Sequence, residues 1–327
     1  MRNFEYLRVG SVEEAVHAKA ANPDARFLGG GTNLIDLMKY EVEEADQLID
    51  VSRLPLARVE PLPSGGVRIG ALVRNSDLAQ HPLIVTAYPV LSQALLAGAS
   101  PQLRNMATTG GNLMQRTRCY YFYDTAFPCN KREPGSGCSA LGGHNRIHAI
   151  LGQSSACIAT HPSDMAVAMV ALDAVVRVHG PNGERAIPIL EFHRLPGDTP
   201  HIDTNLEPDE LIVAVDLPPA RAAAKSRYLK VRDRASYAFA LVSAAVALDV
   251  QNSRIRDARI ALGGVAHKPW RALEAERALA GQPLDEANLR KAAEIALSKA
   301  SGYDDNRFKI DLAKRTIVRA MLELREA

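Results

Sequence analysis

The sequence predicts an α+β protein with two domains, and three observations indicate this. The chain has 327 residues, which is enough for more than one core. Its first part mixes short strand-like runs with helical segments, and its last part has three strand-like runs followed by helices. Between the two parts, the alanine-rich stretch 220–225 has the composition of a linker.

The N-terminal segments lead into a glycine run. Residues 11–14 form a capping box that opens a helix ending near Ala21, residues 25–28 form a short strand, and Leu34 begins a second helix. Between that strand and helix lie Gly29, Gly30, Gly31, Thr32 and Asn33. Glycines allow close backbone approach, and the free N–H groups of such a turn suit a phosphate. The alternative is an ordinary turn between a strand and a helix.

The middle of the chain continues the mixture of strands and helices and adds a second glycine motif, Thr108-Thr-Gly-Gly-Asn112. A hairpin is predicted around Gly180-Pro-Asn-Gly183. Alternating apolar residues, capping residues and turn residues predict strands at 47–51, 67–71, 175–179, 185–188 and 211–217, and helices starting at Ser76, at 89–97 and at 164–174.

The C-terminal part predicts a compact α+β unit. Strand-like runs at 226–231, 239–250 and 254–265 precede helical segments at 271–280, 285–299 and 305–325. The last helix has an apolar face. We expect a three-stranded sheet backed by helices.

Composition excludes two classes of partner. The net charge is +2 and aromatic residues are 5% of the chain, so no basic or base-stacking surface for nucleic acid is expected. No run of 18 apolar residues is present, so no membrane insertion is expected. Residues 1–6 show neither an apolar signal region nor twin arginines.

All four cysteines fall in one loop-rich, basic stretch, 104–165, at positions Cys119, Cys129, Cys138 and Cys157. Their spacing matches neither zinc ribbons nor bacterial ferredoxins. Basic surroundings suit an anionic cluster held by thiolates. An iron–sulfur cluster, a structural zinc ion, two disulfides and unligated thiols all remain open on the residues alone.

Several motifs together resemble the FAD-binding subunits of molybdenum hydroxylases, the family of xanthine dehydrogenase and carbon monoxide dehydrogenase. They are Phe27-Leu-Gly-Gly-Gly-Thr-Asn-Leu34, Ala107-Thr-Thr-Gly-Gly-Asn-Leu113, Pro162-Ser-Asp164 with Ala171-Leu-Asp-Ala174, and Tyr228-Leu-Lys-Val231. Most of that family lacks the long stretch 114–162 that carries the cysteines. This stretch resembles the one in a narrower group, the FAD subunits of bacterial periplasmic aldehyde oxidoreductases, where it holds a 4Fe–4S cluster.

The resemblance implies a fold and its boundaries. We expect a two-subdomain FAD-binding fold of the molybdenum hydroxylase flavoprotein type (PCMH-like) at 1–222. An inserted 4Fe–4S loop at 114–162 and a C-terminal domain at 223–327 complete the chain. The cofactors implied are FAD and one 4Fe–4S cluster, the latter ligated by Cys119, Cys129, Cys138 and Cys157.

The resemblance also implies individual FAD contacts. Asp164 has the alternative role of an acid in a helix first turn, and Lys230 that of a solvated strand residue. No side chain is expected to act as a catalytic acid, base or nucleophile. The implied FAD-binding residues are Phe27, Leu28, Gly29, Gly30, Gly31, Thr32, Asn33, Leu34, Thr108, Thr109, Gly111, Asn112, Asp164, Ile189, Leu190 and Lys230.

The implied function is electron transfer within a molybdenum-dependent aldehyde oxidoreductase. Partners would be a small 2Fe–2S subunit and a large molybdenum-cofactor subunit, forming a heterotrimer, together with an external electron acceptor. We expect a periplasmic location reached by co-export with a signal-bearing partner; a cytoplasmic location is the alternative. Two rival interpretations are the FAD/4Fe–4S subunit of an aromatic acyl-CoA reductase and a zinc-stapled, non-catalytic interaction module.

Overall fold

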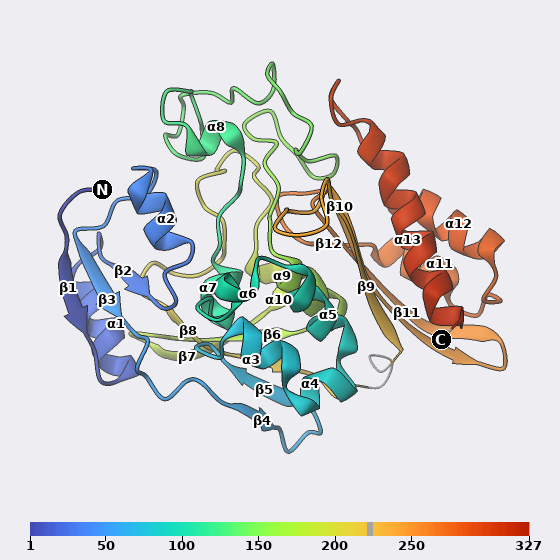
Figure 1. The fold of residues 1–327 in the computed structure, drawn as a ribbon, viewed down its shortest axis with the longest axis horizontal. Coiled ribbons are helices and arrows are strands. Elements are labelled where there is room, and N and C mark those ends of the chain that lie inside the picture. The colour runs from blue at the N-terminus through green and yellow to red at the C-terminus, as the bar shows by residue number, and fades with distance from the viewer. Residues whose placement is uncertain (221–224, 327) are drawn as a thin grey trace.

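The computed structural model describes residues 1–220 and 225–326, so most of the predicted linker at 220–225 lies outside the described residues. The chain forms three sheets with helices between and around them (Figure 1). The strands are β1 (Glu5–Arg8), β2 (Arg26–Leu28), β3 (Gln47–Asp50), β4 (Val59–Pro61), β5 (Val67–Gly70), β6 (Val175–Gly180), β7 (Gly183–Pro188), β8 (Leu211–Leu217), β9 (Ser226–Val231), β10 (Val242–Gln251), β11 (Arg254–Gly263) and β12 (Trp270–Arg271).

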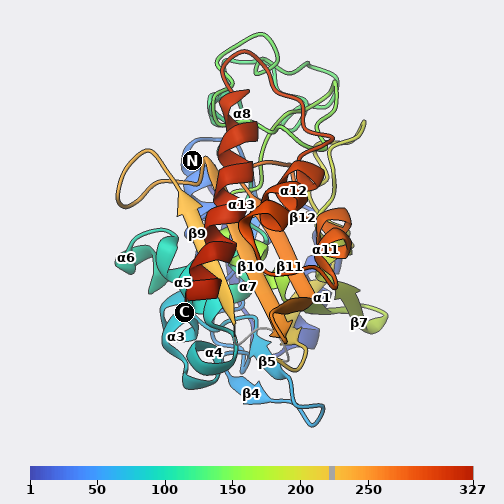
Figure 2. The same cartoon turned by 90° about the vertical axis from the view of Figure 1, so that its right-hand side faces the viewer.

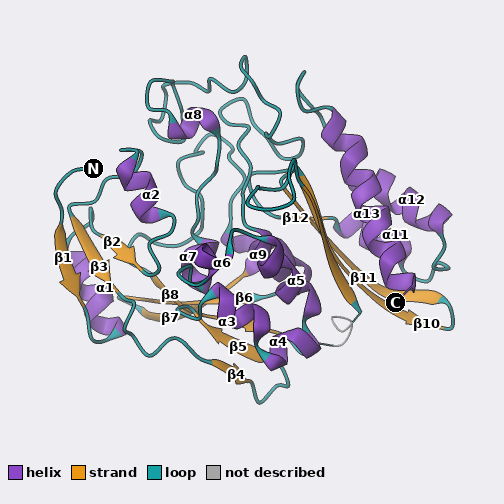
Figure 3. Ribbon diagram, viewed as in Figure 1, coloured by secondary structure: helices purple, strands orange, loops and turns teal. Residues whose placement is uncertain are grey.

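The helices are mostly short, and the longest connections gather at one end of the molecule (Figure 3). They are α1 (Val12–Ala21), α2 (Leu34–Lys39), α3 (Asn75–Gln80), α4 (Pro82–Ala87), α5 (Pro89–Ala97), α6 (Pro101–Arg104), α7 (Thr109–Leu113), α8 (Tyr120–Tyr123), α9 (Asp164–Ala171), α10 (Ile189–Phe192), α11 (Leu273–Leu279), α12 (Glu286–Ala296) and α13 (Phe308–Glu326).

The first glycine run comes directly after β2, which is an edge strand of a small parallel sheet of order β1-β3-β2. As predicted, Ser11 caps α1, because its hydroxyl accepts from the Glu14 backbone N–H at 3.1 Å. Helix α1 packs between this sheet and the five-stranded antiparallel sheet of order β4-β5-β8-β6-β7. Val16, Ile49 and Leu211 are buried in the core that these elements share.

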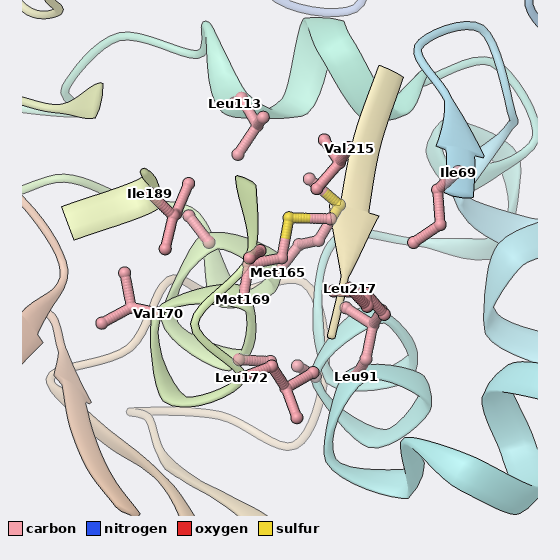
Figure 4. Packing of buried hydrophobic residues seen from close by; sticks show 14 of the residues in the cluster. Ile69, Leu91, Leu113, Met165, Met169, Val170, Leu172, Ile189, Val215 and Leu217 are labelled. Atoms are coloured by element: carbon pink, nitrogen blue, oxygen red, sulfur yellow. The ribbon is translucent and has the colours of Figure 1, made fainter. Parts of the chain in front are cut away.

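Helix α9 occupies the centre of the molecule. All eight of its residues are buried, because the helix packs against the five-stranded sheet on one side and strands β10 and β11 on the other. Met165 and Met169 lie beside Val215 of β8 in the packed interior (Figure 4). Ser163 begins the helix by accepting the Ala166 backbone N–H at 2.9 Å. The rigid start of α9 therefore fixes the neighbouring residue, Asp164.

The C-terminal domain is an antiparallel sheet of order β12-β11-β10-β9, with α11, α12 and α13 on its outer face (Figure 2). The other face packs against α5 and α9. The sequence predicted only three strands here. The fourth strand, β12, is two residues long and pairs Leu262 with Trp270 at the sheet edge. A strand this short has no periodicity to detect.

The cysteine-bearing insertion is a long irregular segment with one short helix, α8, and lies at the loop-rich end of the molecule (Figures 1 and 3). The start of α13 holds it in place. The buried Lys309 Nζ donates to the carbonyl oxygens of Ile147, His148 and Gly264, the last at 2.6 Å. Asn306 Nδ2 donates to the His148 and Ala149 carbonyls. The C-terminal domain therefore clamps the insertion through hydrogen bonds to the backbone carbonyl groups of the insertion.

Candidate functional site: a dinucleotide-sized cleft beside a cysteine-lined hollow

A large cleft opens where the glycine loops, α5, α9 and the connection between β9 and β10 meet. It contains about 1320 Å³ of space that no protein atom occupies, part of it open to solvent. Of the predicted FAD contacts, five line this cleft. They are Thr32, Asn33, Gly111, Asn112 and Asp164.

The first glycine loop, between β2 and α2, lies directly against the second. A Cβ atom added to Gly30 would lie 1.9 Å from the Met106 carbonyl oxygen, so only glycine fits there. Gly31 has φ of +73°, which also favours glycine. The loop ends at Asn33, whose Oδ1 accepts the Arg116 backbone N–H at 3.0 Å. Its Nδ2 is buried and has no partner among the described residues.

The second glycine loop forms the start of α7. The Thr108 hydroxyl accepts the Gly111 backbone N–H at 3.2 Å and caps the helix. Thr109 is fully buried and donates to the Val73 carbonyl at 3.0 Å, so it positions the loop from behind. Asn112 accepts a 2.5 Å hydrogen bond from Ser163, which ties this loop to the start of α9.

Asp164 is the centre of a buried polar group beside the cleft. It accepts from the Tyr228 hydroxyl at 2.5 Å and from Lys230 Nζ at 2.8 Å. Burial, and then the Asp164 charge, raise the pKa of Tyr228 well above its ordinary value. The Lys230 side chain is only 3% exposed, so the alternative role of a solvated strand residue is wrong. Its partner lies 66 residues away in sequence.

The other predicted FAD contacts lie behind the lining or away from it. Phe27 and Leu28 pack into the cores beneath β2, and Ile189 is buried at the start of α10 in the central core. Leu190 packs against that same core, and Leu34 belongs to the small apolar cluster under α2. Their contact with FAD stays a prediction, as does that of Gly29, Gly30, Gly31, Thr108, Thr109 and Lys230.

Sequence reasoning missed several side chains of the lining. Arg104, Gln115 and Arg118 follow or precede the predicted motifs and reach the cleft. Tyr237 and Phe239 come from the connection between β9 and β10 and are 57% and 49% exposed. Tyr237 has φ of 51°, uncommon for a residue other than glycine. The sequence signal that could have indicated this part of the lining was a pair of aromatic residues in the connection after the strand of Lys230.

The cysteines surround a second, smaller space. Cys119, Cys129, Cys138 and Cys157 all line a hollow with about 290 Å³ of space that no protein atom occupies, part of it open to solvent. All four are free thiols, so the disulfide alternative is not supported. Among the described residues, no three metal-binding side chains are close enough together to hold one ion. Four thiols distributed around a hollow suit a multi-atom cluster better than a single zinc ion.

Buried apolar side chains form part of the wall of the hollow, and polar groups reach the sulfur atoms. Phe122 is fully buried in the wall, and burial raises the pKa of Cys119 to about 12 and that of Cys157 to about 11. Thiolates therefore require a bound metal for compensation. His148 Nε2 lies 3.1 Å from Cys119 Sγ, and the Ala159 N–H donates to Cys157 Sγ at 3.4 Å. Such donors suit ligand sulfurs.

A buried ionic network anchors the insertion to the rest of the chain. Lys131, whose side chain is 1% exposed, pairs with Asp203, and Arg116 Nε donates to the same carboxylate at 2.9 Å. Burial alone would raise the pKa of Asp203, but these two cations hold it below its usual range. Arg116 also pairs with Glu43. The insertion is thus fixed between the glycine-loop region and the connection before β8.

Known families match both domains. Residues 2–220 match the FAD binding domain in molybdopterin dehydrogenase, and residues 227–324 match the CO dehydrogenase flavoprotein C-terminal domain. The chain belongs to the FAD-binding subunits of the molybdenum hydroxylases. Among members of this family, the aldehyde oxidoreductase FAD-binding subunit PaoB of Escherichia coli is 55% identical over 326 residues, covering 99% of each chain. The glyceraldehyde dehydrogenase medium chain of Sulfolobus acidocaldarius is 28% identical, covering 93% of this chain and 90% of the relative.

Solved structures of the family share the fold. A carbon monoxide dehydrogenase chain from Hydrogenophaga pseudoflava matches with a TM-score of 0.78 and 26% identity, covering 99% of this chain and 98% of that one. A quinoline 2-oxidoreductase chain from Pseudomonas putida matches with a TM-score of 0.77 and 25% identity over the same shares. The predicted family and FAD-binding fold are confirmed, and the chain is an oxidoreductase subunit. The iron–sulfur content of the insertion stays a prediction.

Proposed function

We propose that this chain is the FAD-binding, electron-transferring subunit of a molybdenum-dependent aldehyde oxidoreductase, a complex that oxidises aldehydes to carboxylic acids. The observation that carries the proposal is the full-length, 55% identity to an aldehyde oxidoreductase FAD-binding subunit. The chain's task is to receive electrons from the partner's 2Fe–2S clusters and deliver them to an external acceptor. The aromatic acyl-CoA reductase and the zinc-stapled module are not favoured by this match.

The residues of the cleft suit a dinucleotide. The two closely packed glycine loops place Thr32, Asn33, Gly111 and Asn112 on its wall. The buried Lys230 and Asp164 supply fixed charges at the start of α9. Bound FAD would supply the capacity to exchange electrons singly or in pairs.

The insertion, in the same proposal, holds a 4Fe–4S cluster through Cys119, Cys129, Cys138 and Cys157. The proposal is supported by the hollow that these four free thiols line and by the apolar wall around it. A cluster with four thiolate ligands exchanges single electrons. The chain's own residues bring His148 Nε2 and the Ala159 N–H to two of the sulfurs.

The proposed assembly is a heterotrimer with a small 2Fe–2S subunit and a large molybdenum-cofactor subunit. No described helix has the length and apolar character needed to cross a bilayer. We propose a periplasmic location, reached together with a partner that carries the export signal. Cell fractionation after deletion of that signal tests this: the chain should then remain in the cytoplasm, and its continued presence in the periplasm would refute co-export.

The decisive experiment uses the purified, FAD-loaded chain without oxygen. A panel of aliphatic and aromatic aldehydes should leave its flavin absorbance unchanged, because aldehyde oxidation belongs to the molybdenum subunit. Addition of the two partner subunits should make the same aldehydes bleach the flavin. Bleaching by aldehyde in the isolated chain would overturn the subunit assignment.

A parallel measurement tests the cluster. The wild-type chain should bind about four iron atoms, and Cys138→Ser should lose them. Gly142→Ala is a matched control within the insertion, because an added Cβ there meets nothing within 4 Å. Equal iron in the wild type and Cys138→Ser would contradict the ligand assignment.

A further inference from the structure

The cleft and the cysteine hollow share a wall made by a few consecutive residues of the insertion. Arg118 lines the cleft, and the next residue, Cys119, lines the hollow. Asn33 and Asp36, from the region of the first glycine loop, also line the cleft and bond this segment directly. The insertion is therefore part of the FAD-binding cleft as well as a holder of thiols.

The guanidinium of Arg118 is held from several sides. Its Nη1 donates to Asp36 Oδ2 at 3.1 Å and also bonds the Tyr123 hydroxyl. Its Cζ lies 5.2 Å from the centroid of the Phe239 ring and 5.4 Å from that of Tyr123. The Nε atom is buried and has no partner among the described residues. Arg118 is therefore a fixed cation in the lining of the cleft.

Another residue of the lining, Asn33, also has a buried donor. The Arg116 backbone N–H bonds Asn33 Oδ1, and this contact turns Asn33 so that its Nδ2 is the group left without a partner. Arg118 Nε and Asn33 Nδ2 are both buried donors of residues that line one cleft. Both side chains line the cleft, and a guanidinium charge beside a side-chain amide suits the carbonyl or phosphate oxygens of a dinucleotide.

We propose that Arg118 is an FAD-binding residue supplied by the cysteine-bearing insertion, so that tight FAD binding depends on a filled cysteine hollow. The inference rests on the proposed function, in which FAD fills the cleft and a cluster fills the hollow. It adds a contact that the glycine motifs do not include and a dependence of one cofactor site on the other.

The connection between the two sites is short. Cys119 is the N-terminal cap residue of α8, and Tyr123 ends that helix. The Tyr123 hydroxyl donates to Asp36 Oδ2 at 3.1 Å, the carboxylate that also holds Arg118. Ligation of Cys119 fixes the start of α8, and α8 then fixes the Tyr123–Asp36–Arg118 group. Loss of the ligated metal leaves four thiols around an empty space, and metal sites of this kind order the loops that form them.

The first test compares Arg118→Gln with the wild type and with Arg290→Gln. Arg290 is an exposed arginine of α12 in an ion pair with Glu286, so its change controls for loss of one surface charge. FAD affinity is measured by recovery of flavin fluorescence on dilution, and iron is measured in the same samples. Arg118→Gln should weaken FAD binding about 10- to 100-fold, as expected for loss of a charged hydrogen bond, with unchanged iron. Wild-type FAD affinity in Arg118→Gln would overturn the proposal.

The second test removes iron at a distance from the cleft. Cys138 lines the hollow but not the cleft, so any effect of Cys138→Ser on FAD must act through the insertion. FAD binding should weaken in Cys138→Ser and should weaken no further in the double variant with Arg118→Gln, because both changes remove the same contact. If the losses of FAD affinity add in the double variant, the proposed dependence of FAD binding on the filled hollow is overturned. Loss of iron with wild-type FAD affinity would overturn it as well.

Failure of this inference can be distinguished from failure of the proposed function. If Cys138→Ser does not fold, iron is removed from the wild-type chain by oxidation and chelation, and FAD affinity is measured before and after. A wild-type chain without iron or without flavin would refute the proposed function itself. A wild-type chain with both cofactors, whose FAD affinity is indifferent to Arg118 and to iron, would refute only this inference.

Discussion

Substitution of Gly30 by alanine should separate the two glycine loops. The added Cβ would lie 1.9 Å from the Met106 carbonyl oxygen and 2.7 Å from its carbonyl carbon. Contacts of Cβ shorter than 3.0 Å are essentially never seen, so the Met106 carbonyl must retreat by at least about 1.1 Å. That carbonyl is backbone and cannot rotate away as a flexible side chain would. The second loop, from Ala107 to Asn112, must move with it.

The size of the effect on FAD follows from this displacement. A hydrogen bond of about 2.9 Å that is stretched by about 1 Å is lost. If FAD loses two bonds to the second loop, each worth about 1 kcal/mol, its affinity falls about 30-fold. The overpacked loop also lowers the free energy of unfolding by about 1–3 kcal/mol, which the protein should survive.

The assay is flavin retained after gel filtration, together with a urea unfolding curve. Gly142→Ala provides the control, because its added Cβ meets nothing within 4 Å. We expect the Gly30→Ala chain to be folded, to contain iron and to lose most of its flavin. Full flavin occupancy in Gly30→Ala would refute the reasoning that contact between the loops shapes the FAD site.

Three further changes test other parts of the site. Asp164→Asn leaves the buried Lys230 without its carboxylate, so urea unfolding should show a loss of about 3–5 kcal/mol, and an unchanged midpoint would contradict the pairing. His148→Gln should move the midpoint potential of the proposed cluster by about 20–60 mV to more negative values in an EPR titration, the one-electron equivalent of one hydrogen bond to Cys119; an unmoved potential would exclude that bond. Burial lowers the pKa of His193 from 6.5 to about 4, so the unfolded chain binds more protons between these values and stability falls as pH drops from 6.5 to 4. His193→Gln should reduce that fall by about 3 kcal/mol, and an identical pH profile would exclude this histidine as its source.

Local pattern was sufficient for the elements that form the scaffold. The predicted strand at 211–217 and the predicted helix at 89–97 coincide with β8 and α5, because each is an apolar run with a proline at one end, Pro218 after the strand and Pro89 at the start of the helix. The predicted Ser11 and Ser163 caps are formed. Short elements such as α7 and β12 were missed, since five or two residues give no period to read.

The cleft could be predicted only in part. The glycine motifs located Thr32, Asn33, Gly111 and Asn112 because the turn itself requires those residue types. Arg118 was counted only as one of several basic residues around the cysteines, and nothing local distinguishes it from Arg132, which bonds backbone carbonyls of the insertion instead. The difference arises from Asp36, 82 residues away in sequence. Contacts of this length come from the fold and leave no periodic trace.

The clamp on the insertion sets an order of events during synthesis. The last cysteine, Cys157, is made about 150 residues before Lys309. At about 5–20 residues per second, the ribosome needs roughly 8–30 s to reach the residues that fasten the loop. During that interval the thiols have left the ribosome while Asn306 and Lys309, which hold the 147–149 backbone, do not yet exist. In the proposed function, this interval is the window for iron–sulfur delivery, and it ends when the start of α13 fastens the loop.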